Sequence, residues 1–309
     1  MTNNKLDKYQ GVIPAFYACY DGEGNICEKR ARAFARYLRD AGVRGLYVNG
    51  SSGECIYLSV DERKKVLEAV MDEVGKDLTI IAHVACNSTR DSVELARHAE
   101  SLGVDAIAAI PPIYFKLPPY AIAKYWNDMS AAAPDTDFVI YNIPQLAGVS
   151  LTVPLLKEMM RNPKVVGVKN SSMPVQDIQM FKEAGKGRLV VFNGPDEQFI
   201  SGRLIGADGG IGGTYAVMPK LFLKADDLIK KGENKKAADV QNDICNIIYA
   251  LCACKGNMYA VIKEVIKRMH GIDCGSVRPP LYPLVPEDEA QVEKCVALIQ
   301  AAEEKAAEY

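Results

Sequence analysis

Short, nearly continuous apolar runs alternate with longer amphipathic stretches along the first two thirds of the chain. Runs of this kind, rich in β-branched residues, are typical of parallel strands that are buried on both faces. Their starting points lie roughly 20 to 35 residues apart, which is the length of a strand followed by a crossover helix. The pattern predicts eight strands, over residues 12–17, 45–49, 78–84, 106–110, 138–142, 165–169, 189–193 and 209–214.

Start and stop signals for helices separate these strands. Ser59 and Glu62 form a capping-box pattern ahead of an amphipathic run. Gly42, Gly103 and Gly206 each follow a helical pattern just before a strand, where a glycine at the helix C-terminus is favoured. Beyond the last strand the pattern is helical, over about residues 218–230, 234–254, 257–270 and 287–306.

Eight strand–helix units predict a (β/α)₈ barrel, the TIM-barrel architecture of the α/β class. We interpret residues 1–230 as the barrel and catalytic domain, and residues 231–309 as a C-terminal helical extension packed on it. A doubly wound open sheet is the alternative, but no glycine fingerprint follows the first strand. The pattern leaves open whether the extension serves packing, oligomerisation or covering of the barrel mouth.

Composition and charge narrow the function classes. The 309 residues are 49% hydrophobic and 25% charged, as in ordinary globular proteins, and the net charge is -2. Such a chain has no basic field to hold nucleic acid, so we expect no nucleic-acid partner. No apolar run is long enough for a membrane span, and the N-terminus lacks a leader pattern, so we expect a cytoplasmic protein without a membrane partner.

The nine cysteines do not suggest a disulfide framework or a metal centre. Their number is odd and they lie among apolar neighbours, which predicts buried, reduced thiols. Cys252 and Cys254 are separated by one residue, and no second Cys or His pair with zinc spacing accompanies them. We therefore expect no metal site.

Reactive groups of a (β/α)₈ barrel lie at the C-terminal ends of its strands, and Lys169 is the most informative residue there. It ends an apolar run that we expect to be buried. Desolvation lowers the pKa of a lysine and makes its amine nucleophilic, which suits Schiff-base formation with a carbonyl substrate. The alternative, favoured for a single residue without context, is a strand-end lysine that reaches solvent.

Other strand ends carry further polar candidates. Tyr141 offers a phenol for proton relay, although a barrel tyrosine bonded to backbone is common. Ser51 and Ser52 lie in a glycine-flanked turn ahead of a helix and predict an anion pocket, or simply a capped turn. Asp196 and Glu197 suit binding of several hydroxyl groups, or placement at a helix N-terminus.

The histidines and the glycine-rich strand are weaker candidates. His83 lies inside a predicted strand, where a hydrogen-bonded core histidine is more common than a catalytic base. His98 and His270 lie on helices, and neither belongs to a visible catalytic or metal-binding pattern. The glycines of residues 209–213 fit neither a Walker A loop nor the Rossmann spacing, and we interpret them as making room near a ligand.

Several of these motifs together resemble a known family. Residues 50–54 (Gly-Ser-Ser-Gly-Glu), residues 141–144 (Tyr-Asn-Ile-Pro), Lys169 and residues 206–212 match the class I aldolase family of dihydrodipicolinate synthase and N-acetylneuraminate lyase. The order and spacing of the motifs match over roughly residues 9–305. Each motif alone is unspecific, whereas the combination is highly specific.

Within this family the chain is similar to the N-acetylneuraminate lyase branch. The segments at residues 81–84 and 193–197 resemble that branch, as does the continuation of Tyr-Asn-Ile-Pro through residues 145–149. The synthase branch typically has an arginine where this chain has Leu146. The resemblance implies a carbon–carbon lyase that cleaves N-acetylneuraminate (sialic acid) reversibly to N-acetylmannosamine and pyruvate.

The resemblance also implies roles for the reacting residues. Lys169 is expected to form the Schiff base with the ketone carbon of the substrate, without metal or organic cofactor. Tyr141 is expected to assist proton transfer at the C4 hydroxyl, and Ser51 and Ser52 to bind the substrate carboxylate. Ser52 stands where a threonine is usual in the family.

Further positions are expected to meet the sugar. Ser171, Gly194, Asp196 and Glu197 form that set by resemblance, and Tyr114 matches a tyrosine placed near the site, often at a subunit contact. The family's members are usually tetramers, which implies a homotetramer.

One departure from the family's pattern concerns the sugar tail. A serine that contacts it is usual where this chain has Gly213, so Thr214 or water would have to replace that hydroxyl contact.

Two alternatives remain open at this point. A dihydrodipicolinate synthase or a 2-keto-3-deoxy sugar-acid aldolase would keep the chemistry and change the substrate, and Leu146 argues against the synthase. A barrel that binds a keto acid without turnover is disfavoured because both Lys169 and Tyr141 are present.

Overall fold

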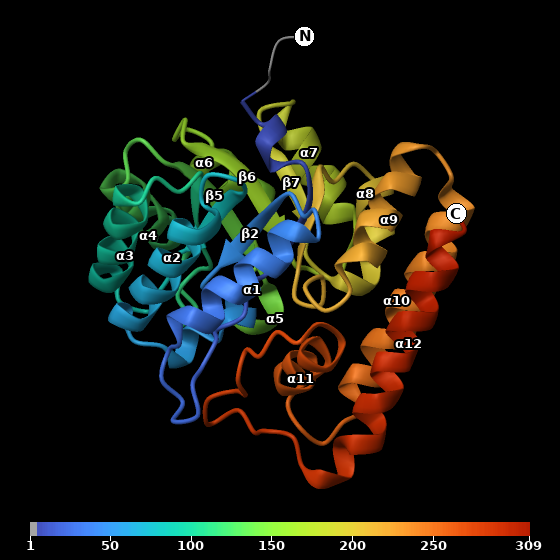
Figure 1. The fold of residues 1–309 in the computed structure, drawn as a ribbon. Coiled ribbons are helices and arrows are strands. Elements are labelled where there is room, and N and C mark those ends of the chain that lie inside the picture. Colours follow the sequence, from blue (N-terminus) through green and yellow to red (C-terminus); the bar gives the residue numbers. More distant parts are fainter. Residues whose placement is uncertain (1–4) are drawn as a thin grey trace.

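Eight parallel strands form the centre of the computed structural model, which describes residues 5–309 (Figure 1). Hydrogen-bonded neighbours follow the order β1-β8-β7-β6-β5-β4-β3-β2. A parallel bridge between Ala15 and Tyr47 joins the two ends of this order, and the Phe16 N–H donates to the Tyr47 carbonyl at 2.9 Å. The strands are β1 (Gly11–Pro14), β2 (Gly45–Val48), β3 (Thr79–His83), β4 (Ala106–Ala109), β5 (Asp137–Asn142), β6 (Val165–Asn170), β7 (Val190–Asn193) and β8 (Gly209–Gly212).

Helices surround the strands and continue beyond them. They are α1 (Glu28–Asp40), α2 (Val60–Val74), α3 (Thr89–Ser101), α4 (Pro119–Ala132), α5 (Pro144–Ala147), α6 (Val153–Met159), α7 (Gln176–Gly185), α8 (Phe199–Leu204), α9 (Pro219–Lys230), α10 (Asn234–Cys252), α11 (Met258–His270) and α12 (Glu289–Ala307). Figure 1 shows α10 and α12 side by side along one flank, with α11 below the strands. The predicted TIM barrel with C-terminal helices is confirmed.

The local signals act as the sequence predicts. Ser59 accepts a hydrogen bond from the Glu62 N–H, and the Glu62 carboxylate accepts one from the Ser59 N–H, so the capping box is complete. Gly42, Gly103 and Gly206 follow their helices with positive φ angles of 86°, 76° and 115°. These angles are open to glycine at little cost, which explains the residue type at each helix end.

Two predicted strand boundaries are wrong by a few residues. The first strand ends at Pro14 instead of Tyr17, and the last ends at Gly212 instead of Thr214. After β1 the backbone keeps bonds to both neighbouring strands, because the Ala15 N–H donates to the Gly212 carbonyl and the Phe16 N–H to the Tyr47 carbonyl. The Tyr17 hydroxyl then donates to the Gly213 carbonyl, just beyond β8. The segment that follows β8 contributes Gly213 and Thr214 to a cavity.

The apolar side chains form an inner and an outer cluster. The inner cluster fills the barrel with side chains from the strands, among them Ile13, Ile81 and Val139. The outer cluster lies between the strands and the surrounding helices and continues into α10–α12. Packing on both strand faces accounts for the continuous apolar runs of the sequence.

A buried ion pair joins the helical extension to the barrel. Lys263 Nζ on α11 lies 2.8 Å from Glu54 Oε1, both side chains are fully buried, and the same Nζ donates to the Ser276 carbonyl at 2.7 Å. Removing one partner of such a pair would leave an uncompensated charge in the interior, so the pair fixes where α11 lies. The division into domains at residue 230 stays a prediction, and it falls at the end of α9, whose last residue is Lys230.

The cysteines are free thiols, but the prediction that they are buried is correct only for some. Cys19, Cys274 and Cys295 are buried, five others are partly exposed and Cys252 is exposed on the last turn of α10.

Within residues 5–309, no three His, Cys, Asp or Glu side chains are grouped as a metal site would require. Over the same residues, none of the helices is both long enough and apolar enough to span a membrane.

Candidate active site

Lys169 lies within β6 and points into the barrel. Strand β6 continues to Asn170, and Lys169 is in register with Tyr141 of β5 and Phe192 of β7. Only 5% of the lysine is exposed. The alternative of a strand-end lysine in solvent is therefore wrong, because the strand runs one residue past it and the side chain faces the interior.

The surroundings of the Lys169 amine are aromatic. Its Nζ lies 3.8 Å from the ring centroid of Tyr141 and 4.2 Å from that of Tyr47. Burial lowers the pKa of Lys169 to about 7, and the carboxylate of Asp196 opposes this shift. The two ring faces favour the charged amine and offset part of the cost of desolvation. A substantial fraction of the amine is neutral near pH 7 and is available as a nucleophile.

Tyr141 presents a protonated phenol next to this amine. Burial raises its pKa to about 12, while hydrogen bonding to Ser51 and Ser171 acts in the opposite direction. The phenol therefore keeps its proton at neutral pH and can donate it in a hydrogen bond. Its two serine partners belong to the loops that follow β2 and β6, so the hydroxyl lies where three strand ends meet.

Asp196 is a buried carboxyl group at the start of the short 3₁₀ helix Asp196–Gln198 after β7. Its Oδ2 accepts hydrogen bonds from the N–H and the hydroxyl of Thr214, both at 2.6 Å. Burial raises the pKa of Asp196 to about 6, and the Thr214 bonds and the charge of Lys169 oppose this. The neighbouring Glu197 is largely exposed to the same cavity.

Ser51 and Ser52 occupy a 3₁₀ helix, Ser51–Gly53, between β2 and α2. The turn brings their hydroxyls beside Tyr141 and beside a residue from the helical extension, since Ser52 Oγ lies 3.0 Å from the hydroxyl of Tyr259. Two adjacent serine hydroxyls that line one cavity suit the binding of a carboxylate.

Gly194 allows the turn after β7 to pass close to the turn after β6. A Cβ atom on Gly194 would lie 2.0 Å from Ser171 Oγ and 2.7 Å from the Asn170 carbonyl oxygen. No larger residue fits without a shift of the backbone. Glycine at this position thus keeps Ser171 and Asp196 on the same side of the cavity.

The structure brings eight of the nine predicted site residues into one cavity of about 290 Å³. These are Ser51, Ser52, Tyr141, Lys169, Ser171, Gly194, Asp196 and Glu197. Tyr114 is the exception, because it is 90% exposed and lines another cavity with Asn87 and Phe115. A role for Tyr114 in this site stays a prediction.

Sequence reasoning missed several lining residues. Tyr259 and Cys252 come from the helical extension, whereas Thr214, considered above only as a replacement for a serine hydroxyl, lies in the loop after β8. No sequence motif marks the two residues of the extension, because they lie on α10 and α11, away from the strand ends where barrel chemistry is expected. Tyr47, which contacts the Lys169 amine with its ring, faces the barrel from mid-strand and has the pattern of any core residue.

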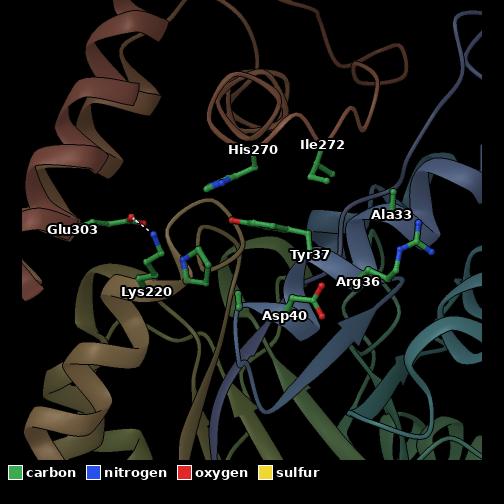
Figure 2. Close-up of a pocket in the computed structure, with 10 residues that line it drawn as sticks. Ala33, Arg36, Tyr37, Asp40, Lys220, His270, Ile272 and Glu303 are labelled. Atoms are coloured by element: carbon green, nitrogen blue, oxygen red, sulfur yellow. Dashed lines mark hydrogen bonds and ion pairs between the residues drawn. The ribbon is translucent and has the colours of Figure 1, made fainter.

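Two of the weaker histidine candidates lie outside this cavity. His83 is buried and its Nδ1 pairs with the Asn49 carbonyl at 3.0 Å, as expected for a core histidine. Figure 2 shows His270 in a separate cavity of about 480 Å³, where its ring lies next to that of Tyr37. The Lys220 amine in that cavity is already paired with Glu303 at 2.7 Å. The cavity beside His270 therefore offers no unpaired lysine as a nucleophile.

Comparison with known proteins relates this arrangement to one family. Residues 8–300 match the model of the dihydrodipicolinate synthetase family. The N-acetylneuraminate lyase of Mediterraneibacter gnavus is 61% identical over 304 residues, which cover 98% of this chain and 96% of the relative. The N-acetylneuraminate lyase of Salmonella agona is 35% identical, with coverages of 96% and 98%. The solved structure of a Ruminococcus gnavus sialic acid aldolase, a catalytic lysine mutant, has a TM-score of 0.96 at 61% identity, covering 97% of this chain and 98% of that one.

Proposed function

The chain belongs to the dihydrodipicolinate synthetase family, and we propose that it is a Schiff-base aldolase that cleaves N-acetylneuraminate reversibly to N-acetylmannosamine and pyruvate. It is an enzyme, a carbon–carbon lyase. The observation that carries the proposal is the buried amine of Lys169, whose pKa is lowered to about 7 beside the protonated phenol of Tyr141. The similar aldolase from Ruminococcus gnavus, a catalytic lysine mutant, supports a reacting lysine.

The reaction follows from the chemistry of an imine. The neutral amine of Lys169 adds to the ketone carbon of the open-chain substrate, and loss of water gives a protonated imine. Removal of the C4 hydroxyl proton lets the C3–C4 bond break, and its electron pair flows into the imine to give an enamine. The aldehyde product leaves, C3 takes up a proton, and water hydrolyses the imine to pyruvate and the free amine. The protonated imine is the electron sink, so the proposal needs no metal or organic cofactor, and activity should survive exhaustive chelation.

The remaining lining residues orient the substrate in this proposal. Tyr141 relays the proton between the C4 hydroxyl and the substrate carboxylate, which Ser51 and Ser52 bind with their hydroxyls. Leu146 lines the same cavity and is 62% exposed, so the wall offers an apolar side chain where the synthase branch would offer an arginine. This feature supports the lyase over the synthase.

The sugar end of the substrate meets a polar wall. Asp196 and Glu197 accept hydrogen bonds from sugar hydroxyls, because carboxylates are strong acceptors, and Ser171 adds a hydroxyl next to Gly194. The cavity joins this wall to Lys169, so one bound molecule can reach both ends.

Borohydride trapping tests the proposal. Reduction in the presence of pyruvate should leave a stable adduct on Lys169, located by mass spectrometry of peptides. The variant Lys169→Ala should give none, whereas the matched variant Lys157→Ala, at an exposed position on α6, should still be trapped. An unmodified Lys169 in the reduced wild-type protein would overturn the Schiff-base mechanism.

A substrate comparison tests the identity of the sugar. N-acetylneuraminate and 2-keto-3-deoxygluconate are offered separately, and pyruvate release is followed with a coupled assay. We expect release from N-acetylneuraminate. Release from 2-keto-3-deoxygluconate alone would assign the chain to the sugar-acid aldolases of the same family.

We further propose a homotetramer in which Tyr114 contributes to a subunit contact. Tyr114, Phe115 and Tyr120 are 90%, 72% and 79% exposed and lie around one cavity, and an exposed aromatic patch of this kind is typical of an interface. Sedimentation of the wild type and of Tyr114→Asp should show a smaller assembly for the variant.

We also propose a cytoplasmic location, where the nine cysteines of the sequence would stay reduced. Fractionation of cells should recover the protein with cytoplasmic markers.

A further inference from the structure

We propose that Tyr259, from the helical extension, is a specificity-determining residue whose hydroxyl binds the polyhydroxylated tail of the substrate in place of the side chain that Gly213 lacks. This inference rests on the proposed function, because it assigns one further contact in the same cavity. The barrel then provides the reacting groups, and the extension provides one hydroxyl group in the space beside Ser52 and Gly213.

The first observation is the space beside Gly213. A Cβ atom built there would lie 3.0 Å from Ser52 Oγ, 3.4 Å from the Tyr259 hydroxyl and 3.9 Å from a carbon of its ring. The φ angle of Gly213 is outside the left-handed region, so its backbone conformation does not require glycine. Glycine at this position makes room, and the tyrosine from α11 fills the room with a hydroxyl group.

The second observation is the hydrogen-bonding capacity of Tyr259. Among the described residues its hydroxyl has one partner, Ser52 Oγ at 3.0 Å. A phenol hydroxyl has one proton to donate and lone pairs to accept with, so capacity is left toward the cavity that Tyr259 lines. Burial raises the pKa of Tyr259 well above its ordinary value. The group therefore stays neutral, as suits contact with sugar hydroxyls.

The third observation is that the phenol is held in place. Tyr259 lies in the first turn of α11, four residues before Lys263, so both side chains lie on one face of the helix. Lys263 is paired with the buried Glu54, two residues after Ser52 in the chain. The ion pair thus fastens the helix that carries Tyr259 to the turn that carries Ser52. A fixed hydroxyl loses little entropy when it binds a substrate.

Tyr17 supports the arrangement from the barrel side. Its ring centroid lies 5.9 Å from that of Tyr259, and its hydroxyl donates to the carbonyl of Gly213. The backbone of Gly213 and the ring of Tyr259 are therefore both held by one side chain. The two positions are structurally coupled, which is what an exchange of a hydroxyl between them requires.

The variant Tyr259→Phe tests the inference, because it removes the hydroxyl and keeps the ring. We expect kcat/KM for N-acetylneuraminate to fall about 10-fold, the effect of one lost hydrogen bond. Borohydride trapping with pyruvate, which has no tail, should be unchanged. Cleavage of a 2-keto-3-deoxy sugar acid with a shorter hydroxylated tail should be reduced less. Tyr249→Phe, at an exposed tyrosine of α10, is the matched control and should behave as the wild type.

The outcomes separate this inference from the proposed function. A wild-type protein that is not trapped by pyruvate and cleaves no sugar acid contradicts the proposed function. If the wild type is trapped by pyruvate and cleaves N-acetylneuraminate, and Tyr259→Phe cleaves it equally well, only the role of Tyr259 is overturned. Equal losses of pyruvate trapping and of cleavage would show that Tyr259 merely orients Ser52, and would also overturn the inference.

A double variant tests the exchange of hydroxyls directly. In Gly213→Ser/Tyr259→Phe, the new serine hydroxyl takes over the contact, and we expect most of the lost kcat/KM to return. Gly213→Ser alone should be less active than the double variant, because its serine side chain and the Tyr259 hydroxyl would share the space beside Ser52, where the new Cβ already lies 3.4 Å from that hydroxyl. A double variant no more active than Tyr259→Phe would contradict the exchange.

Discussion

The lowered pKa of Lys169 makes a quantitative prediction for its reactivity. For an amine with a pKa of about 7, the neutral fraction rises about 10-fold between pH 6 and pH 9, whereas for an ordinary lysine with a pKa of about 10.5 it rises about 1,000-fold. The neutral amine is the reactive form. The reactivity of Lys169 should therefore level off above pH 8, while that of an ordinary lysine continues to climb.

Competitive labelling with isotopic acetic anhydride measures this difference without substrate. The extent of acetylation is determined by mass spectrometry at each pH, and Lys157, exposed on α6, serves as an internal reference. Labelling of Lys169 that climbs in parallel with Lys157 up to pH 10 would refute the reasoning, because it would mean that burial does not lower the pKa of Lys169.

A substitution tests the electrostatic part of the same argument. The carboxylate of Asp196 raises the pKa of Lys169 against the effect of burial. Asp196→Asn removes this charge and should move the midpoint of Lys169 labelling to lower pH than in the wild type. The variant should then be labelled more readily at pH 6. A midpoint that moves upward would show that another group sets the charge state of the lysine.

Three further predictions concern stability and turnover. Lys263→Met should destabilise the protein by about 3–5 kcal/mol in denaturant unfolding, and Glu54→Gln/Lys263→Met should recover part of this loss; equal losses would contradict the ion-pair argument. Gly194→Ala should cost about 1–3 kcal/mol in the same assay, since its Cβ meets Ser171 Oγ at 2.0 Å, and an unchanged midpoint would contradict it. Tyr141→Phe should keep pyruvate trapping but lower kcat by about 10²–10⁴-fold, and normal pyruvate release would exclude the proton relay.

The barrel and the reacting lysine were predictable because each leaves a pattern in consecutive residues. Strands buried on both faces are apolar throughout, so a charged residue within such a run stands out. Lys169 is that residue, directly after Val168. Its direction was not predictable, because a shift of the strand end by one residue decides whether the side chain is buried or exposed. Strand β6 continues to Asn170, which settles the question.

The side chain that α11 contributes to the cavity, Tyr259, leaves no such pattern in the sequence. Tyr259 is a single aromatic residue on an amphipathic helix, and its sequence context is the same whether it packs in a core or lines a cavity. Its position depends on contacts far away in the chain, with Glu54 and Ser52 lying more than 200 residues earlier. The same holds for Tyr47, which contacts the reacting amine only because the barrel closes around it. Pairings of this kind are properties of the three-dimensional fold.

The ion pair between Glu54 and Lys263 anchors α11 to the barrel, so the residues around this anchor can change while the position of the helix is kept. A different helix that keeps Lys263 in place of α11 would change the side chains that α11 contributes to the cavity. Lys169 and Tyr141, which lie on strands of the barrel, would stay the same. Substitutions at one helix end could therefore change the sugar that this architecture accepts without altering the reacting residues. For protein engineering, the first turn of α11 is the segment to randomise when a different aldehyde product is wanted.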